Sequence, residues 1–313
     1  MLRRQLPSAN SLFTFEAVAR LESFSGAASE LNVTQPAVSR SISGLEAHLG
    51  YPLFKRHGRW ISLTANGDKL FRAASSAFNR VTDALRDIDQ QHDNRETVTI
   101  SMSSTAVNYW FIPRMTGFKE KFPSVELDFQ MFSKDGGGPL HDVDLGIRLS
   151  NPLDADMHRW SFADEKILAL CAPGYIATNG SLDRPKQGCS HTLIEQVDQR
   201  YSMDEFFSAT GQNPPVNSST MRFSDYSSVM QAAIQGQGVA LAWITDASLQ
   251  IVKGTLVPAC TQVVKTGRRY HIVASNLIPM RPAVENMRDW LMSEMRNDQK
   301  RVASTLKANW NLF

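Results

Sequence analysis

The residues of this sequence best suited to chemistry are hydrogen-bonding side chains gathered near the N-terminus. They are Thr34, Gln35, Ser39, Arg40 and Ser43, and Pro36 lies among them. At 3.6 residues per turn Pro36, Ser39, Arg40 and Ser43 fall on one side of a helix, with Gln35 beside them. On such a face an arginine can pair with guanine O6 and N7, and a glutamine can pair with adenine. An ordinary solvated helix face would have the same composition, so the stripe alone leaves both interpretations open.

Three helices are expected to position this face. The first carries apolar residues from Leu12 to Ala19 at helical spacing, and a short second helix of small residues covers 25–31. Asn32 and Val33 form a turn, after which Thr34 is a suitable N-cap and Pro36 lies in the first turn of the third helix. That helix has its own apolar stripe, formed by Val38, Ile42, Leu45 and Leu49. A short helix, a tight turn and a polar outward face together indicate a helix-turn-helix that enters a DNA major groove.

A basic hairpin follows over residues 51–63. Lys55, Arg56 and Arg59 surround its expected turn at His57–Gly58, as in a wing that grips phosphates or the minor groove. Residues 1–64 hold seven basic and four acidic side chains, a local charge of +3, whereas the whole chain carries +2. This excess fits a phosphate backbone, although a solvated basic turn would look the same.

The pattern in these residues resembles the LysR-type regulators, and most closely the branch with the glycine-cleavage and β-lactamase regulators. The resemblance is carried by Phe15-Glu-Ala-Val-Ala-Arg20, Leu31-Asn-Val-Thr-Gln-Pro-Ala-Val-Ser-Arg40, Leu45-Glu46, Leu53-Phe54 and Leu63-Thr64. It implies a winged helix-turn-helix over 1–64, DNA contacts by Gln35, Pro36, Ser39 and Arg40, and Thr34 near the DNA backbone.

A long linker helix is expected over 65–94. Its apolar residues are Leu70, Ala74, Ala77, Val81, Ala84 and Ile88, which step by four and three like a heptad seam. The seam can pack on its own domain or on a second copy. The resemblance favours a dimer through this helix, a dimer of dimers, and a two-fold-related DNA site.

Residues 95–313 alternate strand and helix patterns, which predicts α/β architecture with largely parallel sheets. Short strands are expected at 167–171 and 270–274, and one helix from Trp110 to Phe122. Trp110-Phe-Ile-Pro-Arg114, Asp144-Leu-Gly-Ile-Arg148 and Gln231-Ala-Ala-Ile-Gln-Gly-Gln-Gly-Val-Ala-Leu241 resemble the LysR effector domain. This implies a periplasmic-binding-protein-like fold of two lobes, about 95–166 with 268–300 and about 167–267, with a small-molecule effector between them. The tail 297–313 departs from the family pattern. It is expected to be either an extra helix that packs on a neighbour or a frayed end.

The expected effector site combines one subsite for an anionic group and one for a cationic group. Ser103, Ser104 and Thr105 lie between a strand end and a helix start, where a carboxylate can bind, although simple N-capping also explains them. Asp225, Tyr226 and Ser227 occupy the corresponding turn of the other lobe, and Arg148 serves as an anion partner or a structural residue. Trp243 stands where the family has a smaller residue. With Tyr226 and Tyr109 it would place aromatic faces around a cationic head, so the hypothesis is a zwitterionic or onium carboxylate. Trp110 is assigned to the core.

The sequence contains no pattern that predicts catalysis, a cofactor or a metal site. The seven histidines show no HxxH or HExxH spacing, and no GxSxG, P-loop or GxGxxG stands in its proper context. Of the three cysteines only Cys189 is a candidate redox sensor, and Cys171 lies in an apolar run. No apolar run is long enough to cross a bilayer, so a cytoplasmic protein is expected. The rivals to a regulator are an architectural DNA-binding protein and an enzyme fused to a DNA-binding domain.

Overall fold

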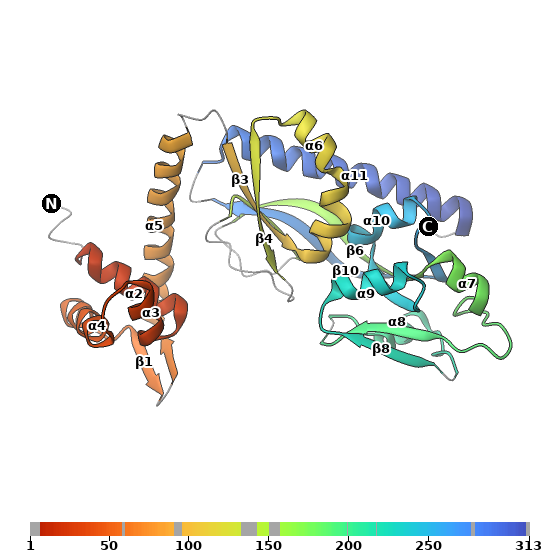
Figure 1. Ribbon diagram of the computed structural model, residues 1–313, viewed down its shortest axis with the longest axis horizontal. Coiled ribbons are helices and arrows are strands. Elements are labelled where there is room, and N and C mark those ends of the chain that lie inside the picture. Colours follow the sequence, from red (N-terminus) through yellow and green to blue (C-terminus); the bar gives the residue numbers. More distant parts are fainter. Residues whose placement is uncertain are drawn as a thin grey trace. The chain divides into compact units, whose positions relative to one another are not determined.

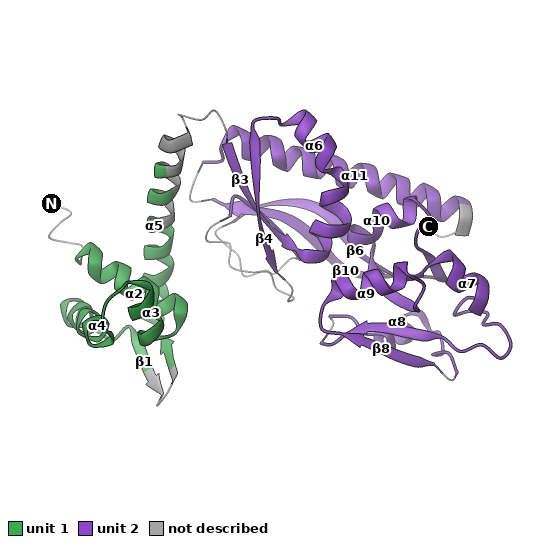
Figure 2. Cartoon of the chain, in the orientation of Figure 1, with its two compact units in different colours: residues 1–93 green, residues 94–313 purple. Residues whose placement is uncertain are grey.

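The structure is a computed structural model that describes residues 7–57, 60–90, 96–132, 143–149, 157–198, 200–216, 218–276 and 279–310. The chain forms two compact units, residues 1–93 and 94–313, coloured separately in Figure 2. Each unit is described by itself.

The first unit is a helical domain with a two-stranded hairpin (Figure 1). Its elements are α2 (Ala9–Leu21), α3 (Phe24–Glu30), α4 (Gln35–Leu49), β1 (Phe54–His57), β2 (Trp60–Leu63) and α5 (Ala65–Gln90). The Ser23 hydroxyl accepts from the amide of Gly26 at 3.0 Å and caps α3. Asn32 takes a left-handed φ of 52° in the turn before α4. The winged helix-turn-helix expected from the sequence is confirmed.

The core of this unit follows the apolar stripes. Phe15 and Val18 of α2, Ala27 of α3, and Ile42 and Leu45 of α4 are each at most 2% exposed and belong to one cluster. The alanine side chain of α3 lets α2 and α4 approach this short helix closely.

The second unit is built on one eight-stranded sheet in the order β4-β3-β5-β10-β6-β9-β7-β8. The strands are β3 (Glu96–Ser103), β4 (Val125–Phe132), β5 (Leu145–Leu149), β6 (Met157–Cys171), β7 (Thr192–Gln196), β8 (Ser219–Phe223), β9 (Val239–Trp243) and β10 (Val257–Ser275). Pairing is parallel at both ends of the sheet, among β4, β3 and β5 and among β8, β7 and β9.

Two long antiparallel strands join these ends. β6 has 15 residues and β10 has 19, so the short strands expected at 167–171 and 270–274 are parts of longer ones. The β6–β10 register shifts at irregularities, including one between Lys265 and Arg269. These irregularities interrupt the alternation of side chains, which is why the sequence pattern underestimated both strands.

The helices cover the faces of the sheet. They are α7 (Pro173–Asn179), α8 (Met203–Thr210), α9 (Tyr226–Ile234), α10 (Ile244–Val252) and α11 (Pro282–Trp310). The single helix expected from Trp110 to Phe122 is wrong: the chain forms a π-helical segment η1 (Ala106–Phe111), a 3₁₀ turn η2 (Ile112–Arg114) and α6 (Met115–Lys121). Pro113 lacks the amide hydrogen that a regular helix would use, which accounts for the change of winding there.

Two lobes are visible in the buried clusters. Ile100, Phe111 and Leu291 lie in the first, and Leu170, Met230 and Ala247 in the second. Up to Trp310 the tail is part of α11 and not a separate helix, and it buries Val302 and Leu306 in the second cluster. Among the described residues, no helix combines the length and apolarity needed to span a membrane.

Candidate functional site

The outward face of α4 is available to a partner. Gln35, Pro36, Arg40 and Ser43 are exposed and Ser39 is half-buried. Thr34 takes the N-cap position with an extended backbone, yet its side chain makes no capping hydrogen bond. Its exposed hydroxyl is therefore not used by the helix. The structure thus brings all six predicted residues to one end and face of α4.

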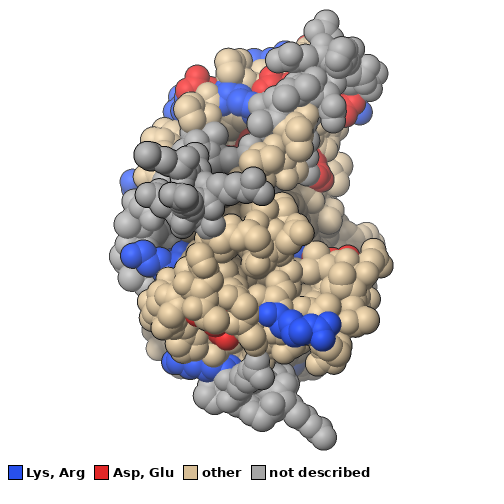
Figure 3. All heavy atoms as spheres, turned by 90° about the vertical axis from the view of Figure 1, so that its left-hand side faces the viewer, with Lys and Arg blue, Asp and Glu red and all other residues tan. Residues whose placement is uncertain are grey.

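The hairpin is tied to α4 by a carboxylate. Glu46 Oε1 accepts from the amides of Leu53 at 2.7 Å and Phe54 at 3.3 Å. These two hydrogen bonds fix the start of β1 against α4. Lys55 is exposed on β1. The side chain of Arg56 and all of Arg59 lie outside the described residues. In the face shown in Figure 3, the described Lys and Arg side chains form separate groups on a mostly uncharged surface.

The second unit contains a cavity of about 110 Å³ between its lobes. Its walls come from the ends of β3, β5 and β9, from the crossing strands β6 and β10, and from the starts of η1, α9 and α10. Seven predicted residues line it, namely Ser103, Ser104, Thr105, Arg148, Asp225, Tyr226 and Trp243. Helix starts and strand ends of both lobes therefore meet at one small space, which is the usual place for a ligand in α/β folds.

Tyr109 and Ser227 are not among the lining residues. The Tyr109 hydroxyl donates to the Ser227 carbonyl at 3.0 Å, and its ring packs against the second-lobe core. The Ser227 hydroxyl lies 3.4 Å from that of Ser104 and 3.3 Å from that of Thr105. Both residues join the lobes to each other and stand outside the wall of the cavity.

Two lining residues already have structural partners. Ser103 Oγ accepts from the Ala106 amide at 3.1 Å, so it caps η1. Arg148 is 7% exposed and donates to the Ser101 carbonyl at 3.1 Å and to Ser101 Oγ at 2.7 Å, while its guanidinium lies 4.4 Å from the Phe132 ring centre. Of the two roles foreseen for Arg148, the structure therefore supports the structural one directly.

Trp243 does not offer its face to a ligand cation in the expected way. Its indole donates to Glu165 Oε1 at 2.8 Å, and the Tyr226 ring meets it edge-on at 5.2 Å. The Arg200 guanidinium lies 5.6 Å from the ring centre. A ligand cation on that face would stand beside another cation, which disfavours the aromatic part of the onium hypothesis.

The sequence reasoning missed Arg200 and Asp246 in the cavity wall. Burial raises the pKa of the Asp246 carboxyl from 3.8 to about 7, while the nearby Arg200 charge and the Thr245 hydrogen bond act against this rise. Asp246 follows a buried strand and Trp243 closely, and this place in the chain was a usable signal. Arg200 lies in a loop without any pattern, and only the folded chain brings it to the cavity.

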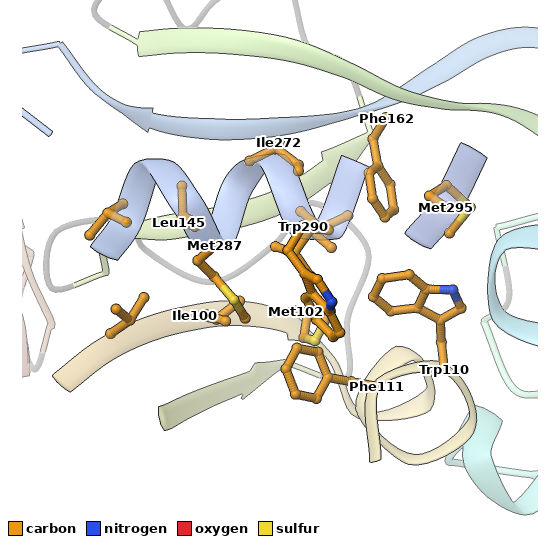
Figure 4. Close-up of a cluster of buried hydrophobic side chains, with 14 of the residues drawn as sticks. Ile100, Met102, Trp110, Phe111, Leu145, Phe162, Ile272, Met287, Trp290 and Met295 are labelled. Carbon is orange, nitrogen blue, oxygen red and sulfur yellow. The ribbon is translucent and has the colours of Figure 1, made fainter. Parts of the chain in front are cut away.

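Trp110 is a core residue, as expected, and it also borders the cavity. Figure 4 shows its ring in the first-lobe cluster, among side chains from β3, β6 and α11. The Phe162 ring meets it edge-on at 5.7 Å.

The cysteines and metal ligands add no second site within the described residues. Cys171 is fully buried, and burial raises the pKa of its thiol to about 12. Cys189 is half-buried, with its sulfur 3.8 Å from the Thr178 carbonyl oxygen. No group of three or more potential metal ligands occurs in the part of the chain that the structure describes.

Comparisons with known proteins agree with the description of both units. Residues 9–68 match the bacterial regulatory helix-turn-helix protein, lysR family, and residues 91–296 match the LysR substrate binding domain. The glycine cleavage system transcriptional activator of Escherichia coli (strain K12) is 29% identical over 96% of this chain and 98% of its own length. The transcriptional activator AmpR of Pseudomonas aeruginosa is 32% identical over 77% of this chain and 80% of its own.

Among solved structures, full-length LysG from Corynebacterium glutamicum with bound effector Arg has the same fold. Its TM-score is 0.56 at 16% identity, covering 93% of this chain and 99% of LysG. The two family matches are separated by residues 69–90 and follow the order of the two structural units, and the second alone covers more than half of the sequence. This chain therefore belongs to the LysR family of DNA-binding transcriptional regulators.

Proposed function

We propose that this regulator reads its operator with α4 and responds to a small zwitterion bound between the lobes of its second unit. The observation that carries the proposal is the charge of the cavity wall. Arg148 and Arg200 supply positive charge, and Asp225 and Asp246 supply negative charge, all around one small space. A molecule with one charged group of each sign matches such a wall, because a buried charge is stabilised only when it is paired.

The anionic end belongs at Ser103–Thr105. The amides and hydroxyls at the start of η1 favour a carboxylate, and Arg148 adds its charge beside them. The cationic end belongs at Asp246 and Asp225, in place of the aromatic faces. A bound ammonium group would favour the ionised form of Asp246 and draw its pKa back down.

DNA contact is proposed for Gln35, Pro36, Ser39 and Arg40 in the major groove, with Thr34 and the basic residues of the hairpin at the phosphates. The copies are proposed to pair through α5, so that two α4 helices meet a two-fold-related site, and two such pairs span neighbouring sites. The ligand acts by binding one arrangement of these pairs more tightly than another. No catalytic step is included, and the proposed location is the cytoplasm, where the DNA is.

A ligand screen tests the charge pattern of the cavity. The full chain is mixed with each proteinogenic amino acid, and thermal unfolding reports binding. For each amino acid that binds, the amine lacking its carboxylate and the acid lacking its α-amino group are compared by calorimetry. We expect each analogue to bind at least about tenfold more weakly, since a charged partner in the wall is then left unpaired.

Asp246→Asn should cause the same loss for the intact amino acid. The matched control is Asp164→Asn, because this exposed carboxylate is paired with Arg269 and is not among the lining residues. Equal binding by the amine, the acid and the parent compound would refute a zwitterion site. Chemical change of the ligand after incubation would instead favour the enzyme alternative.

DNase footprinting on DNA upstream of the chain's own gene tests regulation. We expect a protected region whose length or pattern changes when the ligand is added. Protection along the whole fragment, without a preferred region and unchanged by ligand, would favour an architectural protein.

A further inference from the structure

One helix belongs to the cores of both lobes. The first part of α11 buries Met287, Leu291 and Met295 in the first-lobe cluster, and its last part buries Val302 and Leu306 in the second-lobe cluster. The 29 residues contain no glycine, and their proline stands at the first position. Such a helix is a continuous rod of about 43 Å at 1.5 Å per residue. Figure 1 shows it running from the side of β3 and α6 to the side of α10.

A buried carboxylate lies on this rod between the two buried stretches. Asp298 is 3% exposed, and its Oδ2 accepts from Trp110 Nε1 at 2.7 Å and from the Ser248 hydroxyl at 3.2 Å. The same oxygen is ion-paired with Arg114, whose Nε also lies 3.4 Å from Glu294. One oxygen therefore holds groups from η1, η2 and α10.

Two of these partners lie in the cavity wall or one helical turn from it. Trp110 and Met295 line the cavity from the first-lobe side. Thr245 and Asp246 line it from the start of α10, one turn before Ser248 on the same helix. Asp298 itself does not belong to the lining. A shift of this carboxylate would move wall residues of both lobes at once.

We propose that the C-terminal part of α11 is an interlobe strut, and that Asp298 is a positioning residue that presets the cavity from outside it. A strut anchored in both cores limits hinging of the two lobes against each other, so binding acts through small displacements of η1 and α10. The link to effector affinity rests on the proposed function, whereas the mechanical coupling of the lobes does not.

Hydrogen–deuterium exchange on the ligand-free full chain tests the strut. In Asp298→Asn the side chain keeps its size and loses the charge that holds Arg114. We expect amides of η1 and α10 to exchange about tenfold faster or more, while those of β4 and α8 keep their wild-type rates. Asp289→Asn is the matched control, because that carboxylate is exposed on the same helix beside Arg288, and it should change none of these segments.

A second pair of variants keeps the test decisive if Asp298→Asn fails to fold. Trp110→Phe retains an aromatic ring in the core but removes the indole donor together with one ring of the indole, so η1 and α10 should again be the segments that exchange faster. Leu306→Ala, compared with its exposed neighbour Lys307→Ala, should loosen α10 from the far end of the strut. Unchanged exchange in η1 and α10, or an equal rise in every segment of both lobes, would overturn the proposal.

Calorimetry connects the strut to the effector. For any amino acid that binds the wild-type chain, Asp298→Asn should weaken binding at least about fivefold and Asp289→Asn should not. Equal affinity in the two variants would overturn the positioning role of Asp298. If no amino acid binds the wild type, the zwitterion proposal fails, and the exchange experiment still decides on the strut.

Discussion

At the residue scale, Glu165 determines the orientation of the Trp243 side chain in the cavity wall. This carboxylate is 1% exposed and is approached by the indole of Trp243 at 2.8 Å and by Arg268 at 2.7 Å. Arg200 lies 3.6 Å away and also reaches the Trp243 ring. A buried charge must be compensated by such donors, so the unusual tryptophan is held by the protein before any ligand arrives.

Arg40 is proposed to contact bases and Lys55 to contact phosphates, so their substitution should cause different losses of DNA affinity. Arg40→Ala should weaken binding to a footprinted operator by about 1–3 kcal/mol and weaken binding to unrelated DNA much less. Lys55→Ala should weaken both and lower the slope of log affinity against log salt by about one. Fluorescence anisotropy over a salt series measures both effects.

Arg72→Ala is the control for these variants, because Arg72 is exposed on α5 and paired with Asp68. A similar loss for operator and unrelated DNA in Arg40→Ala would contradict a base contact by that residue.

The raised pKa of Asp246 predicts that the free energy of unfolding depends on pH. Burial raises its pKa to about 7 in the folded chain, above the ordinary value of 3.8. The folded chain therefore holds this proton more tightly than the unfolded chain. Its stabilising contribution is complete below about pH 4 and is lost as the pH rises to about 7.

Urea unfolding at pH 5 and pH 8 measures this effect. The midpoint should fall less between the two pH values in Asp246→Asn than in the wild type. Asp164→Asn, at an exposed position, should behave as the wild type. An identical fall in all three proteins would contradict a raised pKa for Asp246.

At the element scale, the junction between the hairpin and α5 depends on close backbone approach. The Thr64 hydroxyl accepts from the Gly67 amide at 3.0 Å and donates to the Pro52 carbonyl at 2.9 Å. A Cβ on Gly67 would lie 2.1 Å from the Leu53 carbonyl oxygen. Since backbone cannot move aside cheaply, the hairpin and α5 require glycine there.

Gly67→Ala should therefore destabilise the first unit by about 1–3 kcal/mol, as overpacking does. Gly44→Ala is the matched control, because nothing lies within 4 Å of its Cβ position on α4, and it should stabilise by up to about 1 kcal/mol. Circular dichroism during thermal unfolding gives the midpoints. Equal midpoints for the two variants would show that the junction tolerates a side chain.

The elements also show where sequence patterns succeed. The stripes of α2 and α4 were predictable because a helix that packs on one side repeats its apolar residues every three to four positions. The α11 tail was not, because only Val302 and Leu306 mark its buried face among polar residues. The charged pair Asp298 and Arg114 is separated by 184 positions, and no local pattern connects such partners.

At the scale of the whole molecule, α5 has a free apolar face in the single chain. Leu70 packs against the core of the first unit, and Phe78 stacks on Phe13 with ring centres 4.4 Å apart. Further along, Val81 is 60% and Leu85 57% exposed, one turn apart. The seam thus begins in its own domain, and its described residue Val81 is exposed with the neighbouring Leu85, as expected for a helix that a second copy covers.

Leu85→Glu should shift the chain from dimer or larger assemblies towards monomer, because a charge would replace apolar surface in the contact. Sedimentation equilibrium at several concentrations measures the change. Thr82→Glu places the same charge one turn away on an exposed polar position, and it should leave the assembly intact. A wild-type chain that is monomeric at all concentrations would refute pairing through α5.

The sequence by itself determined the winged helix-turn-helix, the outward-facing polar residues of α4 and the α/β character of the second unit. These features depend on short-range periodicity and turn chemistry, which neighbouring residues specify. Only the tertiary structure decided which side chains share the cavity, why Tyr109 and Ser227 stand outside it, and that α11 joins both lobes. Those facts depend on where β6 and β10 cross and on charges buried far apart in the sequence, and burial is a property of the folded chain alone.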